Sequence, residues 1–263
     1  MTNVYERVST VNLNTKLSSG KTILDDVYFT SPFKVMRPFY ITDEYIRVVI
    51  MSSSAGIMAG DSQEYNINVG NGTKLELTSQ SYEKIHKMID SSASRKCTIT
   101  VGKNAMLKYN PQPTIPFAES NFESLIKIEL ADESSRLFFT DIISCGRCGF
   151  GEEFKYTRYK STIDAKCNDT LIYRDNTNYM PNEVDMTGYG YFEGYTHLAN
   201  IYIANVPHDN DTLEKVGQVL DLEDISAGFS VTKGGNINIK ILGYSGDILS
   251  SISNMIIDIF EEI

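Results

Sequence analysis

The stretch QEYNINVGNGTKLELT, residues 63–78, decides the fold class of this chain. Apolar and polar residues alternate through YNINV (65–69) and again through LEL (75–77), on either side of the glycine-rich turn GNG (70–72). This period of two is the pattern of a half-buried β-strand, because successive side chains of a strand point to opposite faces. Two such runs around glycines predict a β-hairpin.

The same alternation recurs along most of the sequence. It returns at Cys97–Val101 before the turn Gly102–Asn104, at Ile126–Leu130, at Phe154–Tyr156, and at Ile237–Ile241 after Gly234–Gly235. The pattern amounts to roughly a dozen short strands, which predicts an all-β dominated fold arranged as a sandwich, a barrel or a coil-like sheet. No repeat of fixed length is evident, so a regular solenoid is not predicted.

Two segments near the C-terminal end follow a helical period instead. Leu213, Val216 and Leu220 share one helical face. The preceding Asp211 or Thr212 is a suitable N-cap, so a short helix is predicted here. A longer apolar stripe begins after Asp247 and comprises Leu249, Ile252, Met255, Ile256, Ile259, Phe260 and Ile263. This stripe predicts an amphipathic helix docked on the protein's own sheet, with a partner-binding helix as the alternative.

The composition is that of a globular protein with an acidic surface. The 263 residues carry 24 Lys and Arg against 34 Asp and Glu, a formal net charge of −10, and 41% are hydrophobic. This content is enough for a core, and the negative charge disfavours nucleic acid as a partner. No linker or low-complexity tract divides the sequence, so one domain over residues 1–263 is expected.

Neither a membrane-spanning nor a secretory segment is evident. No run approaches the roughly 20 apolar residues that span a bilayer. Glu6 and Arg7 stand where a signal peptide needs an apolar stretch. A cytoplasmic location without a membrane partner is therefore expected, and there the four cysteines are expected to be reduced thiols.

Motifs for nucleotide hydrolysis and for a tight metal site fail. Ser19–Thr22 reads like the end of a phosphate-binding loop, but that loop needs a glycine where Thr15 stands, so a plain turn is predicted. His86, His197 and His208 lack the short spacing of metal ligands within one chain. No nucleophile motif of a known hydrolase class occurs.

The pair Cys145 and Cys148 forms a CxxC motif, which can chelate a soft metal or cycle as a dithiol. A structural zinc site usually needs a second pair, and Cys97 and Cys167 are isolated. A thioredoxin-type motif needs a βαβ unit, which a strand-rich chain does not supply. Two small residues at a strand end are therefore the preferred interpretation over a thiol site.

Two carboxylates and one proline-rich stretch remain as candidates. Asp61 and Glu152 each follow a glycine, which lets the backbone turn sharply or approach another group closely. A turn-capping Asp and a solvated Glu are the simpler interpretation. Asn110–Phe117 contains three prolines, which predicts an extended segment along a sheet edge and excludes a central strand. That segment either docks another protein or covers an edge.

Five groups of residues follow one another between residues 31 and 154. They are Ser31–Lys34 with Arg37–Tyr40; Gly56–Asp61; Thr78–Ser81 with Lys84–His86; Pro113–Phe117; and Gly146–Arg147 followed by Gly151–Phe154. This ordered set resembles the urease accessory protein family called UreD in most bacteria and UreH in some. Beyond residue 154 the resemblance rests on length, strand pattern and the two late helices. The cysteines around Gly146–Arg147 depart from the family pattern.

The resemblance implies a non-catalytic maturation factor whose fold is a distorted β-sandwich or a helix-like stack of sheets, with short helices near the C-terminus. It implies binding to urease apoprotein and, through a UreF-type partner, to a GTPase of the UreG type. It also allows a homodimer within the complex. Nickel then reaches the buried urease site while a lysine there is carbamylated. GTP belongs to the partner, and this chain handles Ni²⁺ only transiently, with no tightly bound cofactor.

A carrier that releases its metal needs few ligands, because a full set of Cys and His would trap Ni²⁺. We therefore expect Asp61 and Glu152, with Asp141 as a third candidate, to line a polar path for the ion. Gln80 and Arg147 are expected to position this path by hydrogen bonding.

Two alternatives stay open. A carbohydrate-active enzyme or lectin on a β scaffold would use Asp61 and Glu152 as an acid and base pair. The absence of tryptophan argues against it, because sugar sites depend on large aromatic platforms. A passive scaffold without metal contact is the other alternative.

Overall fold

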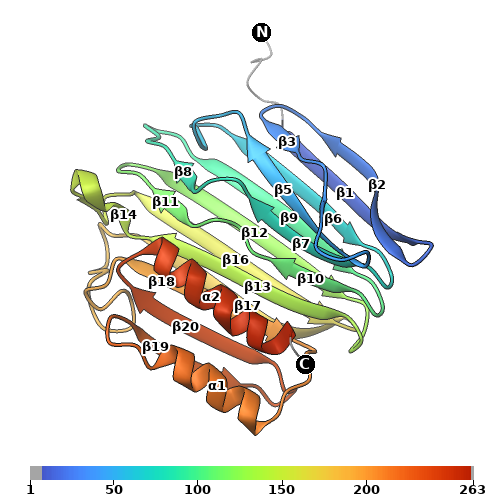
Figure 1. Cartoon of the computed structure of the whole chain (residues 1–263). Helices are drawn as coiled ribbons and strands as arrows, with labels where there is room; N and C mark the ends of the chain where they lie inside the picture. Colours follow the sequence, from blue (N-terminus) through green and yellow to red (C-terminus); the bar gives the residue numbers. More distant parts are fainter. Residues whose placement is uncertain (1–7, 262–263) are drawn as a thin grey trace.

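The computed structural model describes residues 8–261, which form two stacked β-sheets with two helices on one outer face (Figure 1). The first sheet contains, in spatial order, β2 (Lys21–Phe29), β1 (Ser9–Ser18), β6 (Ser62–Val69), β9 (Ala93–Val101), β12 (Asn121–Leu130), β16 (Arg158–Cys167) and β17 (Thr170–Tyr179). The main path of the second contains β3 (Phe33–Val35), β5 (Tyr45–Ser52), β7 (Lys74–Ser79), β10 (Met106–Tyr109), β13 (Arg136–Ser144), β18 (His197–Ala204), β20 (Ile237–Gly243) and β19 (Ser226–Val231).

Shorter elements complete the molecule. They are β4 (Phe39–Tyr40), β8 (Glu83–Ile85), β11 (Thr114–Pro116), β14 (Gly146–Arg147), the 3-10 turn η1 (Cys148–Phe150), β15 (Glu152–Glu153), α1 (Asn210–Leu220) and α2 (Gly246–Glu261). The predicted fold class, many short strands in stacked sheets with two late helices, is confirmed. The predicted strand at Phe154–Tyr156 is wrong, because the local strand ends at Glu153. No helix among residues 8–261 is long and apolar enough to cross a membrane.

The predicted hairpin at residues 63–78 is also wrong. Strand β6 belongs to the first sheet and β7 to the second, so the turn Gly70–Gly72 is a corner between sheets. The chain passes through the first sheet, a corner and the second sheet several times, and we call each such passage a coil. In the first sheet β6 pairs in parallel with β9 of the next coil, and in the second sheet β7 pairs in parallel with β10. Alternation shows that one face of a strand is buried, but not which strand is its neighbour. Here the two apolar faces meet across the interior instead of lying side by side.

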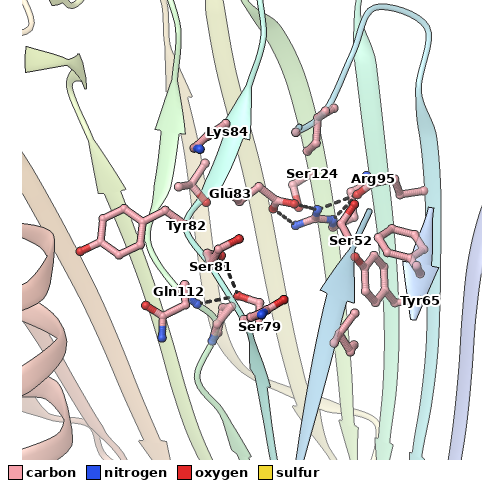
Figure 2. Close-up of a pocket in the computed structure, with 18 of the residues that line it drawn as sticks. Ser52, Tyr65, Ser79, Ser81, Tyr82, Glu83, Lys84, Arg95, Gln112 and Ser124 are labelled. Carbon is pink, nitrogen blue, oxygen red and sulfur yellow. Dashed lines mark hydrogen bonds and ion pairs between the residues drawn. The ribbon is translucent and has the colours of Figure 1, made fainter. Parts of the chain in front are cut away.

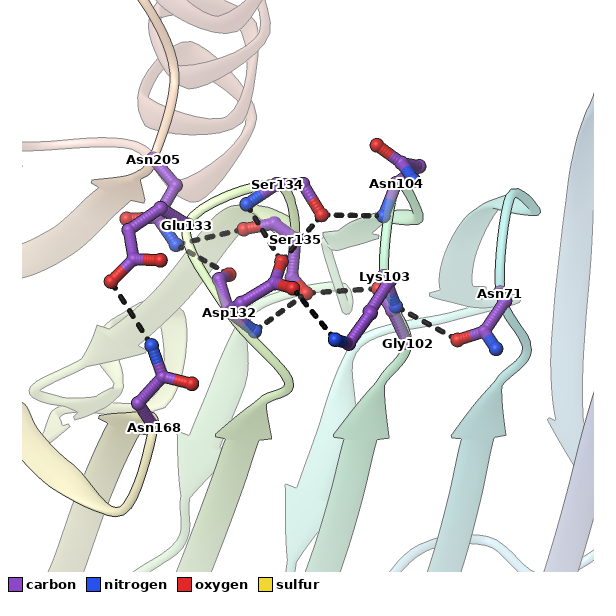
Figure 3. A network of polar contacts seen from close by, with 10 residues as sticks. All are labelled: Asn71, Gly102, Lys103, Asn104, Asp132, Glu133, Ser134, Ser135, Asn168 and Asn205. Atoms are coloured by element: carbon purple, nitrogen blue, oxygen red, sulfur yellow. Dashed lines mark hydrogen bonds and ion pairs between the residues drawn. The ribbon is translucent and has the colours of Figure 1, made fainter.

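Stacked corners explain why successive coils run parallel (Figure 3). The Asn71 side-chain oxygen accepts a hydrogen bond from the backbone N–H of Lys103 at 2.9 Å. The next corner continues the stack, because Ser135 Oγ donates to the Gly102 carbonyl at 2.9 Å. A Cβ at Gly102 would lie 2.5 Å from Asn71 Oδ1, so only glycine allows this approach.

The coils advance unevenly, in keeping with the absence of a fixed sequence repeat. In the first sheet Ser62 pairs with Ser94, Ser94 with Glu123, and Glu123 with Lys160. Successive coils therefore advance by 32, 29 and 37 residues. Each coil carries a different insertion at the same end of the strands: β8 in the first, β11 in the second and the segment β14–η1–β15 in the third, which is the longest.

Both predicted helices are present, and the predicted docking of the C-terminal helix on the protein's own sheet is confirmed. Helix α1 begins at Asn210, and its N-cap is Asp209, whose carboxylate accepts from the Thr212 N–H at 2.9 Å. The predicted cap at Asp211 or Thr212 is wrong, because both residues lie within the first turn, and the N-cap is the residue just before the helix, here Asp209. The apolar stripe of α2 packs on β13, β18 and β20, with α1 alongside it. Met255 does not belong to this face, because it is half exposed, and Ile257 takes part in its place. Ile263, the last residue of the predicted stripe, and Glu6 and Arg7 lie outside the described residues.

Two further segments differ in how well they were predicted. Ser19 and Gly20 form the tight turn between β1 and β2, as a plain turn predicts. The proline-rich segment is extended, but its strand β11 pairs with β8 on one side and meets β13 at Thr114 on the other. It therefore lies between strands and not along an edge. Pro116 is tolerated there because β13 meets β11 only at Thr114.

Candidate functional site

A polar cavity of about 220 Å³ lies between the two sheets. Its walls are the first residues of the strands of the first sheet and the last residues of the strands of the second. The stacked corners of Figure 3 join the opposite ends of these strands. We call this cavity the chamber. It is open at one end of the molecule, and the apolar core between the sheets closes the other.

Strand register places a row of polar residues along the chamber wall. Gln63 pairs with Arg95, Arg95 with Ser124, and Ser124 with Ser161. All four line the chamber. The row therefore spans four parallel strands at one height, although its members are far apart in sequence.

Arg95 is the charged centre of this row (Figure 2). Its Nε and Nη2 donate to Gln63 Oε1 at 3.0 and 2.6 Å, and its guanidinium forms a bidentate ion pair with Glu83. The guanidinium also lies over the Tyr65 ring, 5.1 Å from its centroid. Burial lowers the pKa of Arg95, but Glu83 and Tyr65 raise it more, so the net pKa is well above the usual value. The cation is therefore held rigidly and already neutralised.

Asp141 lies on the opposite wall, on β13, and has no ion-pair partner among residues 8–261. Burial, and then the charge of Asp175, raise the pKa of Asp141 to about 6, against the opposing effect of Arg95. Above that pH the chamber holds a carboxylate that is not neutralised by a direct partner. Such a group is suited to attract a cation.

A second, smaller cavity of about 20 Å³ adjoins the chamber, because Asp141, Tyr159 and Ser161 line both. It also contains Asp175 and Asn200. This volume is close to that of one water molecule or ion.

The polar groups of the small cavity are only partly satisfied. Asn200 donates to Tyr173 OH at 2.6 Å, but its Oδ1 atom is buried and has no hydrogen-bond partner within the described residues. Lys240 Nζ donates to Asp175 Oδ2 at 3.0 Å and is half exposed. The small cavity thus lies between the chamber and the half-exposed Lys240.

The mouth of the chamber is built by the loop after β7. Ser79 Oγ accepts from the Gln112 N–H at 2.9 Å, which ties this loop to the proline-rich segment (Figure 2). Tyr82 OH donates to Asp247 in the first turn of α2. Gln80 is exposed at the mouth. The mouth is therefore anchored on two other elements.

Of the five residues predicted for the metal path, the structure brings together two. Asp141 and Gln80 line the chamber, whereas Asp61, Glu152 and Arg147 do not. Asp61 Oδ2 accepts from the Met58 N–H at 2.8 Å, as a turn-capping residue does. A role of these three in the path stays a prediction.

Glu152 and Arg147 form their own ion pair on the segment that follows β13. Arg147 Nε donates to Glu152 at 2.7 Å, and this hydrogen bond lowers the pKa of the Glu152 carboxyl. The Ala118 N–H donates to the same carboxylate at 3.2 Å. Because Asp61 and Glu152 belong to separate networks, no observation favours the acid and base pair of a sugar-cleaving enzyme.

The thiols and histidines do not assemble a metal centre. The Sγ atoms of Cys145 and Cys148 lie 3.4 Å apart as free thiols. Within residues 8–261, no group of three or more His, Cys, Asp or Glu side chains is arranged to hold a metal ion. A tight, closed site is thus not built from these side chains.

Sequence reasoning missed Glu83, Arg95, Asp175, Asn200 and Lys240. For Arg95 a signal was present, because it occupies the inward position between Ala93 and Cys97 in the alternation of β9. A charge at an inward position of a strand indicates a polar site. Asn200 pairs with Lys240 through the register of β18 and β20, and Asp175 of β17 reaches them only because the two sheets stack. No local sequence pattern reports either relation.

Comparison with known proteins gives a consistent result. The family model described as UreD urease accessory protein matches residues 8–262. Urease accessory protein UreD of Acetivibrio thermocellus is 35% identical over 258 residues, covering 97% of this chain and 98% of that protein. Urease accessory protein UreH of Helicobacter pylori (strain P12) is 35% identical over 248 residues, covering 94% and 92%. That of Helicobacter hepaticus is 33% identical over 235 residues, covering 89% and 91%.

Proposed function

This chain belongs to the UreD family of urease accessory proteins, and from this we propose that it serves urease maturation by passing Ni²⁺ through the chamber between its sheets. The observation that carries the proposal is Asp141, a carboxylate without an ion-pair partner among the described residues that lines both the chamber and the small cavity behind it. The relatives are named accessory proteins, which agrees with a non-catalytic role.

The few carboxylates in the chamber favour transit over storage. Arg95 neutralises Glu83, so Asp141 is the free acidic group of the chamber. At the next step Lys240 competes for Asp175, which limits how tightly that carboxylate holds a dication. With an association rate constant of about 10⁷ M⁻¹s⁻¹, a site of roughly micromolar affinity empties about ten times a second. Weak sites in series thus allow both entry and exit.

We propose urease apoprotein as the receiver and UreF- and UreG-type proteins as the partners that supply the ion. GTP hydrolysis then belongs to the UreG-type partner, in agreement with the plain turn at Ser19 and Gly20. One opening of the path is the mouth at Gln80, and the other lies beside Lys240. Each partner would cover one of these openings.

The test replaces the acidic groups of the path without changing their shape. Asp141→Asn and Asp175→Asn, singly and together, are combined with urease apoprotein and the partner proteins, and nickel per urease is measured by mass spectrometry. We expect a several-fold loss of delivered nickel in the double variant. Asp164→Asn is the matched control, because Asp164 pairs with Arg174 outside the chamber. Copurification of the partners must be unchanged in all variants.

Two results would change the proposal. Normal nickel delivery by the Asp141→Asn, Asp175→Asn variant, with the complex intact, would leave a passive scaffold as the function. The Asp61→Ala, Glu152→Ala variant tests whether the path continues beyond the chamber. A loss of nickel in that variant, with folding and partner binding intact, would extend the path to these residues.

A further inference from the structure

We propose that Cys145 and Cys148 are a redox-active dithiol that closes to an intramolecular disulfide on reaction with a peroxide. The proposal is independent of nickel passage. The two thiols lie at the base of the segment β14–η1–β15, which projects from the end of the sheets (Figure 1). Their Sγ atoms are 3.4 Å apart, in van der Waals contact. Phe150, between them and β15, is 77% exposed.

The backbone holds the two thiols together by contacts that involve neither sulfur atom. Gly146 pairs with Glu153 and Arg147 with Glu152 in a short antiparallel ladder. Gly146 has φ +134°, and a Cβ there would overlap the Glu152 carbonyl oxygen, so the turn requires glycine. The Arg147 ion pair with Glu152 closes the same turn. Closure therefore needs only a small movement of two side chains whose backbone is already placed.

The two thiols differ in access, which assigns them different roles. Cys145 is fully buried in an apolar cluster with Tyr156 and Phe192, whereas Cys148 is half-buried. Burial, and then the hydrogen bond with Cys148, raise the pKa of the Cys145 thiol. Cys148 is thus the thiol that an oxidant reaches, and Cys145 is the one that resolves the intermediate.

The reaction balances with hydrogen peroxide as the oxidant. The Cys148 thiolate attacks one peroxide oxygen, the O–O bond breaks, and Cys148 becomes a sulfenic acid while hydroxide leaves and takes up a proton as water. Cys145 sulfur then attacks the Cys148 sulfur, the S–O bond breaks, and a second water leaves with the Cys145 proton. Two thiols and one peroxide thus give one disulfide and two waters, and an external dithiol reverses the change.

A disulfide suits these surroundings better than a metal ion. No third His, Cys, Asp or Glu ligand joins the pair within residues 8–261, so a bound ion would keep open coordination positions. Cys145 is buried in an apolar cluster with Phe192, which disfavours a charged thiolate at that position, whereas a bound metal ion would need both sulfur atoms as thiolates. A disulfide is neutral and needs no further ligand.

The experiment exposes the full-length protein to an equal amount of hydrogen peroxide, alkylates free thiols under denaturing conditions, and maps the peptides by mass spectrometry. We expect the peptide with Cys145 and Cys148 to be lighter by two hydrogen atoms and to remain unalkylated. After reduction with dithiothreitol, both cysteines should be alkylated again. Cys97 and Cys167 are internal controls that stay alkylatable. Both are buried, and burial raises the pKa of Cys97 to about 12.

Two variants separate the roles of the thiols. In Cys145→Ser, Cys148 should accumulate as a sulfenic acid that dimedone traps. In Cys148→Ser, which changes only the half-buried position, Cys145 should resist oxidation. The proposal is overturned if the wild-type pair stays alkylatable after peroxide, or if a sulfenic acid persists on Cys148 of the wild type. Oxidation of Cys145 in Cys148→Ser, at the wild-type rate, would also overturn it.

Discussion

The two ends of the space between the sheets are built on the same strands and have opposite chemistry. At the closed end Ile67, Ile99 and Ile128 occupy one row across the first sheet, and all are buried. Four residues earlier on the same strands, the row is Gln63, Arg95 and Ser124. The backbone ladder is continuous through both rows. The side chains alone turn a packed core into a chamber.

This difference shows how the molecule can contain a polar interior. Each buried apolar side chain contributes roughly 1.5–3 kcal/mol by leaving water. Buried polar groups cost free energy unless they are paired. Asn200 Oδ1 is such a group, because it has no hydrogen-bond partner within the described residues. The apolar rows and the stacked corners at the closed end therefore stabilise the coils, and the open end can hold polar groups such as Asp141. Four substitutions test this difference between the closed apolar end and the open polar end, from the largest expected effect to the smallest.

Ile99→Ala should have the largest effect. Ile99 is fully buried in the core between the sheets, and its truncation leaves a cavity, so we expect the free energy of unfolding to fall by about 2–5 kcal/mol. Thr100→Ala, at the neighbouring position on the exposed face, should cost less than about 1 kcal/mol. Urea denaturation measures both. Equal costs would mean that the closed end does not stabilise the coils.

Arg95→Gln should come next, because it leaves Glu83 in the chamber without its partner. Removing one member of a buried pair costs up to about 3–5 kcal/mol, and the partial exposure of the two side chains, 13% for Arg95 and 24% for Glu83, should reduce this to roughly 2–3 kcal/mol. The double variant Arg95→Gln, Glu83→Gln should recover most of the loss. A double-mutant cycle from denaturation curves gives the coupling free energy between Arg95 and Glu83. A coupling free energy of zero would contradict the pairing.

Gly102→Ala probes the stacked corners at the closed end. The added methyl group would meet the Asn71 side chain and backbone, so the corner must shift, at a cost of about 1–2 kcal/mol. Gly149→Ala is the matched control, since among residues 8–261 no atom outside its chain neighbours lies within 4 Å of its Cβ position. Thermal unfolding should show a lower midpoint for the first variant only. If the unfolding midpoint of Gly102→Ala equals that of the wild type, the corners tolerate separation.

Asp141→Asn should have the smallest effect at neutral pH and a characteristic pH dependence. The pKa of Asp141 is raised to about 6, so the folded state binds more protons than the unfolded state between about pH 4 and 6. Stability of the wild type should therefore fall as pH rises through this window. The variant should lack this fall and be more stable at pH 7. A pKa difference of about two corresponds to about 2.7 kcal/mol, and because Asp141 is only partly buried, solvent screening should reduce the gain to on the order of 1 kcal/mol.

Asp164→Asn is the control of opposite sign. Arg174 lowers the pKa of Asp164 by a hydrogen bond, so its contribution to stability is present above about pH 4 and is lost on acidification. Denaturation midpoints from about pH 2 to 8 compare the two variants, because the Asp164 contribution is lost below about pH 4 and that of Asp141 changes between about pH 4 and 6. If both follow the same pH dependence, Asp141 is not in the desolvated environment described.

The candidate site was only partly predictable. Asp141 and Gln80 were named from the sequence, and Arg95 could have been, because its inward position in β9 follows from alternation. Asp61 and Glu152 were singled out for the glycines before them. Those glycines serve local turns, so the same signal pointed to turn-capping and ion-paired side chains outside the chamber.

The sequence by itself determined which residues of each strand face inward, where the two late helices lie, and which family the chain resembles. Those properties depend on neighbours within a few positions, and local patterns report them. Only the tertiary structure decided that β6 and β7 belong to different sheets and that Asp141 and Asp175 line one small cavity. Strand partners depend on hydrogen bonds between corners about 30 residues apart, such as Asn71 with Lys103, and an alternating pattern is compatible with either pairing.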